Sequence, residues 1–250
     1  MAAASVAVGE DISFQIETGE KASSTALVAF QAPATWAGHH AVTTQGGKAG
    51  GVLQVDKEGR AVLQVEGLQK NDNLHFTASA LSPDARSLEW KQEGDLLHAV
   101  LRNGEAPRSV FSYQMAAGPV PAGVSQVYRH GAHLHPVYTP SGRLLTDNHP
   151  ADHLWHRGIW MSWTKTEFEG GAPDFWNMGK PLVKGAAEGP LLAEIRFDTW
   201  LRTWEGPVQA GFTSQHRFID RTSGVEKDVL TETWEVTVSS FGGAEPMHVI

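Results

Sequence analysis

The sequence predicts an all-β protein built as an antiparallel β-sandwich. Short segments in which apolar and polar residues alternate recur along the chain, and this period of two is typical of strands with one buried face. The 26 glycines and 13 prolines supply frequent turn signals, and few windows place apolar residues at helical spacing. Since β-sandwiches of 250 residues commonly form one domain, we expect residues 1–250 to be a single domain, with 1–115 and 124–250 as candidate sub-layers.

The first half of the chain contains six predicted strands separated by turn residues. They cover 11–17, 25–30, 51–55, 60–65, 74–81 and 96–102. The turn Asp56–Gly59 joins two of them, which indicates a meander of antiparallel strands. Pro and Gly residues at 116–123 deny the backbone helical and central-strand hydrogen bonds, so we expect a surface loop or linker there.

The second half begins with two short elements and continues into long strands. Residues 137–145 resemble a strand that turns through Pro-Ser-Gly into another, and residues 148–153 suggest one helical turn with Pro150 near its first position. Three long alternating strands follow at 191–204, 208–220 and 229–239. Residues 247–250 read as the beginning of one more strand, which predicts that the chain is shortened at this end.

Composition excludes several functional classes. No window approaches the ~18–20 consecutive apolar residues of a membrane-spanning helix, and the start of the chain lacks the features of a secretory signal, so we expect a soluble, cytoplasmic protein. The absence of cysteine excludes disulfides, thiolate metal ligands and a cysteine nucleophile. A net charge of −8 argues against nucleic acid as a partner. The expected partner is therefore a small molecule or an oligosaccharide, with no nucleic acid and no membrane.

The most distinctive segment is dense in histidine. Six histidines occur between residues 130 and 156, where imidazoles poised near neutral pH could bind a ligand, transfer protons or hold a metal. The candidate ligands for a divalent metal are His133, His135 and His149, but their spacing matches neither the zinc-protease helix nor the cupin pattern. Polar substrate recognition or acid–base chemistry is therefore favoured slightly over metal binding.

Tryptophans and carboxylates extend this candidate site. Trp163 and Trp176 have polar neighbours and could stack on a sugar ring, although most tryptophans in a β-sandwich belong to the core. Alternation places Glu232 on an apolar face, where it and His216 of the adjacent predicted strand could face one cavity. In the alternative interpretation, Glu232 pairs with an arginine, either Arg217 or Arg221, in a strand ladder.

Five blocks of the sequence together carry a family resemblance. They are Pro136–Gly142, Asp152–Trp160, Asp174–Trp176, Gln215–Arg217 and Thr231–Val236. On these blocks the chain resembles the bacterial PmoA family, also labelled methane oxygenase PmoA-like. That label implies membrane methane oxidation, which needs transmembrane helices that this sequence does not predict. Family members look like β-sandwich proteins that accompany sugar-processing oxidoreductases, so the resemblance implies carbohydrate metabolism.

The resemblance also implies site residues. Carried over by motif, these are His135, His153, His156, Arg157, Asp174 and Trp176. Trp155 stands where the family often has a histidine, which weakens a metal site that needs three imidazoles, and family members usually continue into a further block absent from this chain.

The fold resembles the galactose-mutarotase-like supersandwich of aldose epimerases, in which a His acid and a Glu base act on a sugar. By this fold-level analogy His153 or His156 is the acid and Glu232 the base.

The leading hypothesis is a carbohydrate-active enzyme of epimerase, lyase or hydrolase type, working by acid–base chemistry with or without a divalent metal. The predicted catalytic residues are His153, His156 and Glu232. The predicted substrate-binding residues are Asp152, Arg157, Trp163, Asp174, Trp176 and His216. A non-catalytic carbohydrate-binding β-sandwich is the alternative, and a metal-dependent oxygenase is a third, less favoured hypothesis.

Overall fold

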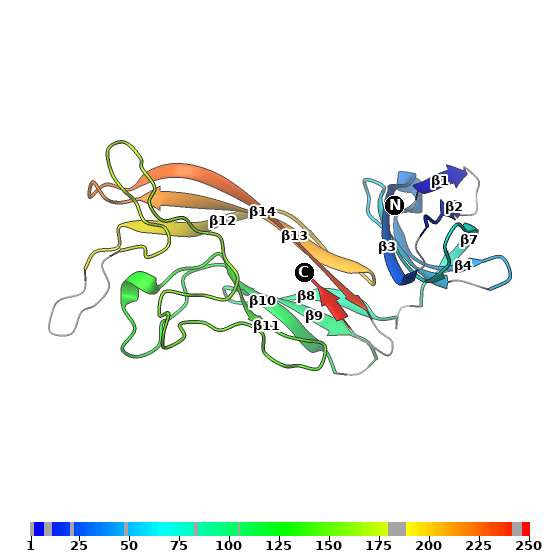
Figure 1. Cartoon of the computed structure of the whole chain (residues 1–250), viewed down its shortest axis with the longest axis horizontal. Helices are drawn as coiled ribbons and strands as arrows, with labels where there is room; N and C mark the ends of the chain where they lie inside the picture. The colour runs from blue at the N-terminus through cyan, green and yellow to red at the C-terminus, as the bar shows by residue number, and fades with distance from the viewer. Residues whose placement is uncertain are drawn as a thin grey trace. The chain divides into compact units, whose positions relative to one another are not determined.

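The computed structural model describes most of the chain as antiparallel β-sheet (Figure 1). The residues that it describes are 3–7, 12–20, 23–47, 50–82, 85–104, 106–179, 189–241 and 247–250. The chain divides into two compact units. Unit 1 comprises residues 1–88, 102–106 and 205–210, and unit 2 comprises residues 89–101, 107–204 and 211–250. Whether the whole chain behaves as one domain stays a prediction.

Unit 1 is organised around one seven-stranded antiparallel sheet in the order β1-β2-β7-β4-β5-β6-β3. Its strands are β1 (Ala3–Ala7), β2 (Ser13–Glu17), β3 (Ser23–Gln31), β4 (Gly38–Thr44), β5 (Gly50–Val55), β6 (Arg60–Leu68) and β7 (Asn73–Ala80). Strands β1 and β2, and strands β4, β5 and β6, pair in chain order as in a meander; β7 lies between β2 and β4, and β3 lies at the edge beside β6. The core explains this departure, because Phe14 and Phe76 face each other across β2 and β7 with their rings stacked at 5.4 Å.

Unit 2 confirms the sandwich prediction. One of its sheets has the order β11-β10-β9-β8 and the other has the order β12-β13-β14-β15, and Figure 1 shows the two as separate layers. The strands are β8 (Ser87–Glu93), β9 (Leu96–Arg102), β10 (Arg108–Gln114), β11 (His133–Val137), β12 (Ala193–Trp204), β13 (Gln209–Asp220), β14 (Lys227–Phe241) and β15 (Met247–Val249). Aromatic rings fill the space between the layers: Phe212 of β13 lies 4.9 Å from Tyr113 of β10 and 5.8 Å from Trp90 of β8, measured between ring centroids.

The predicted helical turn at 148–153 is a single turn, in which the amide of His153 donates to the carbonyl of Pro150 at 2.9 Å, and it does not extend into a helix. This segment belongs to a hairpin-like loop, in which the amide of His149 donates to the carbonyl of His156 at 2.9 Å and the amide of Gly158 donates to the carbonyl of Asp147 at 2.8 Å. His149 has a φ of 57°, so no helical conformation begins before Pro150. Pairing between the two arms of the loop satisfies the backbone groups that a helix would have satisfied internally.

The strands β4, β8 and β10 have no counterpart among the predicted elements. In β8 most side chains are at least partly exposed, and in β10 four consecutive residues are buried, so neither shows regular alternation. A register shift between Ser109 and Phe111 contributes to the irregularity of β10. Among the described residues, no helix is long and apolar enough to cross a membrane.

Candidate functional site

The long connection between β11 and β12 brings the two histidine blocks of the sequence together. Leu134 in β11 and Ile159 exchange backbone hydrogen bonds of 2.8 and 3.0 Å, which places the end of the 147–158 loop beside β11. Gly158 makes this approach possible, because a Cβ there would lie 2.1 Å from the carbonyl oxygen of Leu134. Arg157 is thereby held close to the histidines of β11.

Arg157 is the central residue of this region. Its side chain is only 2% exposed, its Nη1 donates a long hydrogen bond of 3.4 Å to the carbonyl of His130, and its Nε has no partner. Among the described residues, no aspartate or glutamate forms an ion pair with it. Burial lowers the pKa of the guanidinium to about 9, which leaves it charged at neutral pH.

Two buried imidazoles lie against this cation. His130 and His133 are 2% and 4% exposed, and their ring centroids are 5.4 Å apart. Burial, reinforced by the positive charge of Arg157, lowers the pKa of His133 to about 3 and that of His130 well below its usual value. Both rings are therefore neutral at physiological pH. In each ring Nδ1 lies near the carbonyl oxygen of Gly131, while Nε2 of His130 is buried without a partner.

His135 and His149 are half-buried at the edge of the same region. Nδ1 of His135 is 2.9 Å from the hydroxyl of Thr146, and Nδ1 of His149 is 2.6 Å from the carbonyl of Leu154. Burial lowers the pKa of both imidazoles. Within the described part of the chain, no three histidine, aspartate or glutamate side chains gather as a metal-ligand set. The predicted ligands His133, His135 and His149 therefore do not form a site that fits a divalent metal.

Aromatic rings extend the site. The ring of Trp160 lies 4.7 Å from that of His130 and 5.4 Å from that of Trp176. Oδ1 of Asp174 accepts hydrogen bonds from the amides of Trp176 and Asn177, so this carboxylate shapes the turn that carries Trp176. We call Arg157, His130, His133, Trp160 and Trp176 the Arg157 cluster. His130 and Trp160 were not among the predicted site residues, although both occur in the histidine- and tryptophan-rich blocks that pointed to this region.

The other predicted residues of the loop are more exposed. The side chains of Asp152 and His153 are 80% and 57% exposed and form an ion pair of 3.0 Å, which lowers the pKa of the aspartate. His156 is half-buried, and its backbone takes part in the turns of the loop. Trp163 is 48% exposed and packs on Phe218 at 5.8 Å.

A second polar group lies between the two sheets of unit 2. Nδ1 of His216 is 2.9 Å from Oε2 of Glu232, and its Nε2 is 2.7 Å from the hydroxyl of Tyr113 and 3.0 Å from that of Ser214. Glu232 and His216 thus face each other, as the alternation of β14 predicts. His216 is fully buried, and burial raises the pKa of Tyr113. None of the contacts among the described residues joins this group to His153 or His156.

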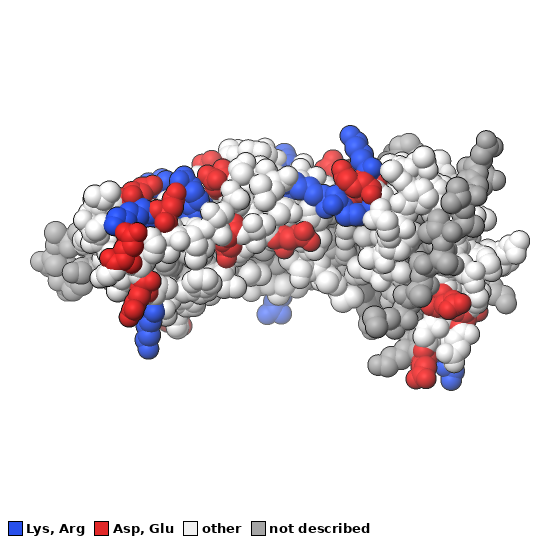
Figure 2. All heavy atoms as spheres, turned by 90° about the horizontal axis from the view of Figure 1, so that it is seen from above, with Lys and Arg blue, Asp and Glu red and all other residues white. Residues whose placement is uncertain are grey.

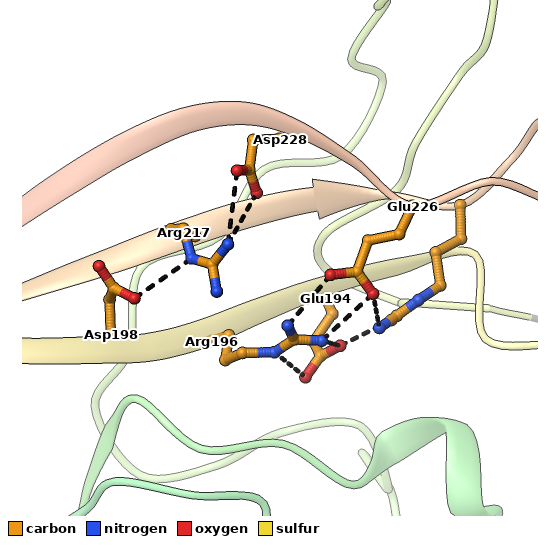
Figure 3. Close-up of polar contacts among 7 residues, drawn as sticks. Glu194, Arg196, Asp198, Arg217, Glu226 and Asp228 are labelled. Atoms are coloured by element: carbon orange, nitrogen blue, oxygen red, sulfur yellow. Dashed lines mark hydrogen bonds and ion pairs between the residues drawn. The ribbon is translucent and has the colours of Figure 1, made fainter.

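The arginines offered as alternative partners of Glu232 pair elsewhere. On the outer face of β12–β14, Arg217 contacts Asp198 at 3.3 Å and Asp228 at 3.4 Å (Figure 3). Arg196 and Arg221 share two carboxylates, which are those of Glu194 and Glu226. Figure 2 shows acidic and basic side chains intermingled on this surface. We call these residues the ion-pair ladder.

A pocket of about 230 Å³ lies in another part of unit 2. It is lined by Leu101, Arg108, Ser109, Tyr138, Thr139, Pro140, Ser141, Gly142 and His248. All five residues of the Tyr-Thr-Pro-Ser-Gly motif line this pocket. Nη1 of Arg108 donates a hydrogen bond of 3.1 Å to the carbonyl of Pro140.

Residues 100–248 match the model of a protein family of unknown function, DUF6807. The chain belongs to this family. The DUF6807 region contains the Arg157 cluster, the His216–Glu232 pair and the ion-pair ladder. No curated protein and no solved structure shows significant similarity to the chain. For this DUF6807 member, function has to be argued from the chemistry of the site.

Proposed function

We propose that this DUF6807 member is a carbohydrate-active protein that binds a sugar or sugar derivative at the Arg157 cluster and acts on it by acid–base chemistry. One observation carries the proposal. Buried polar atoms without partners, Nε of Arg157 and Nε2 of His130, occur beside a pair of tryptophan rings. A sugar offers the complementary surface, because its ring has an apolar face and its hydroxyls both donate and accept hydrogen bonds.

The energetic argument concerns the unpartnered atoms. Leaving one buried polar group without a hydrogen bond costs about 1–3 kcal/mol, so proteins rarely leave several such groups in one place. A bound hydroxylated ligand would satisfy Nε of Arg157 and Nε2 of His130 at once, which would recover this free energy as affinity.

The catalytic part of the proposal rests on the half-buried imidazoles. His135 and His149 have lowered pKa values, so they are neutral at physiological pH and able to accept a proton. His153 and His156 remain candidates for proton transfer because they belong to the loop that carries Arg157. The resemblance to the PmoA family, with its link to sugar-processing enzymes, supports carbohydrate as the substrate class.

A non-catalytic carbohydrate-binding protein is the second candidate. It is favoured by Trp163, whose ring is 48% exposed and is available for stacking at the surface. The two candidates place the sugar on different tryptophans, which makes them separable.

The test is calorimetric titration of the protein with a panel of neutral and acidic monosaccharides. Trp176→Ala is expected to weaken binding about ten-fold or more, and the matched control Trp163→Ala to leave it unchanged; stacking at the surface would reverse this pattern. His149→Asn should bind but fail to convert the sugar, as followed by proton NMR. Unchanged turnover would remove His149 from the chemistry, and absence of saturable binding to every sugar would overturn the proposal.

A further inference from the structure

Arg157 is a buried cation with no counter-ion among the residues that the structure describes. Among the described residues, none of the ion pairs involves it, and its single hydrogen bond is the long one to the carbonyl of His130. The one cation–π contact of the described chain is made by a different arginine, Arg202 over Trp204. A guanidinium removed from water in this way is costly unless a negative partner approaches it.

The neighbouring side chains cannot supply that negative charge. His130 and His133 are neutral or positive at every pH at which proteins are folded, and Trp160 and Trp176 are uncharged. Asp152, the nearest acid in sequence, is 80% exposed and paired with His153. Asp147 is exposed, and its carboxylate accepts a hydrogen bond from the amide of Asn148. The missing anion therefore has to come from outside the described chain.

We propose that Arg157 binds the carboxylate of the ligand, so that the sugar derivative recognised by this protein is a polyhydroxy acid. This inference rests on the proposed function and narrows it to sugar acids, such as aldonates and uronates. A carboxylate matches the planar fork of one guanidinium and can accept two parallel hydrogen bonds from it.

His130 adds a requirement for a hydroxyl. When its Nδ1 carries the proton and donates to the carbonyl of Gly131, Nε2 is an acceptor without a partner. An acceptor would repel the carboxylate itself but would bind a hydroxyl that donates a hydrogen bond. A guanidinium and a neutral imidazole side by side thus fit a hydroxyl close to a carboxylate, which is the arrangement at the acid end of a sugar acid.

Arg157 would also attract a phosphate, but the single positive charge of the cluster favours a carboxylate. A phosphate monoester carries close to two negative charges and three strong acceptor oxygens. The Arg157 cluster offers one cation and two neutral imidazoles, which balances a single charge. His149 is half-buried, and the positive charge of Arg157 adds to the burial that lowers the pKa of its imidazole.

The decisive experiment uses the wild-type protein alone. Calorimetric titration compares glucuronate with its methyl ester, because esterification removes the charge and leaves the ring and hydroxyls in place. Loss of a charge-assisted contact is expected to weaken binding about ten- to hundred-fold. Equal affinity of acid and ester would overturn the carboxylate inference while leaving the proposed function intact.

Three further arms separate the alternatives. Tighter binding of glucose 6-phosphate than of glucuronate or gluconate would assign the site to phosphate and overturn the inference. Failure of every sugar to bind would overturn the proposed function as well. Arg157→Gln should abolish the preference for the acid over the ester, whereas Arg217→Gln, a change in the ion-pair ladder, should preserve it.

Discussion

The arginines of unit 2 occur in two contrasting settings. In the ion-pair ladder, Arg196, Arg217 and Arg221 are partly exposed and each contacts two carboxylates (Figure 3). Arg157 is buried and contacts none of the described carboxylates. Water already solvates the charges of the ladder, so its arginines gain little from their counter-ions. Arg157, which is removed from water, would gain most from a counter-ion and has none among the described carboxylates.

This difference shows how each region acquires its partners. In the ladder, strand geometry brings acids and bases together, as when Glu194 and Arg196, two residues apart, share one face of β12. In the 147–158 loop, two acids, Asp147 and Asp152, precede Arg157 in the sequence, and both are exposed at the surface. These two carboxylates are close to Arg157 in the sequence but form no ion pair with it. The guanidinium is therefore left to bind an external anion.

The largest predicted effect is on the pH dependence of stability. His130 and His133 have pKa values far below 6.5 in the folded protein, so the unfolded chain binds protons that the folded chain cannot. As pH falls below about 6.5, each imidazole should lower the free energy of unfolding by about 1.4 kcal/mol per pH unit, because a new positive charge beside Arg157 meets no carboxylate.

Urea denaturation between pH 7.5 and pH 5 measures this slope. His133→Gln should make the slope shallower, and His153→Gln, a change of an exposed histidine, should leave it as it is. Stability that does not change over this range would contradict the burial of neutral imidazoles beside Arg157.

The second prediction replaces the buried cation by an apolar side chain. Arg157→Met should raise the free energy of unfolding by about 1–4 kcal/mol, because it removes an uncompensated buried charge, and it should eliminate the binding of sugar acids. The matched change Arg217→Met in the ladder should alter stability by no more than about 1 kcal/mol. Urea denaturation at pH 7.5 measures the stability of both variants. If Arg157→Met destabilised the protein as much as breaking a buried ion pair does, Arg157 would have a counter-ion in the protein, which would contradict the prediction.

The third prediction supplies Arg157 with an internal counter-ion. Asn148 is directly opposite Arg157 in the antiparallel bridge of the loop, and its Oδ1 is buried without a partner. Asn148→Asp places a carboxylate there with almost no change in shape. Affinity for glucuronate should fall about ten-fold while affinity for its methyl ester changes little. Calorimetry of Asn148→Asp beside Asn148→Ala distinguishes the charge from loss of the amide, and equal losses in both variants would reject the effect of charge.

The fold was largely predictable because most strands carry regular alternation. The strand at 96–102 was predicted with the bounds of β9, and the three long strands of the second half correspond to β12, β13 and β14. Strands without that pattern, such as β8 and β10, gave no such signal. The order of strands in unit 1 depends on which apolar faces pack together, as for Phe14 and Phe76, and short-range pattern does not contain this information.

Histidine density led to the candidate site, whose function stays a prediction. Alternation predicted that His216 and Glu232 face each other, and the structure shows this pair. The predicted helical turn is one of two successive turns, closed by hydrogen bonds from the amide of His153 to the carbonyl of Pro150 and from the amide of His156 to the carbonyl of His153. Within the described part of the chain Arg157 has no counter-ion, because Asp147 and Asp152 are exposed at the surface. Their exposure depends on the turns of the loop, which the order of residues in the sequence does not reveal.

A crystal structure of the protein with gluconate or glucuronate bound would test the central claim most directly. We predict that both carboxylate oxygens of the ligand lie about 2.7–2.9 Å from guanidinium nitrogens of Arg157, with a ligand hydroxyl at Nε2 of His130. A sugar acid bound elsewhere, or Arg157 paired with a carboxylate of the protein itself, would contradict it.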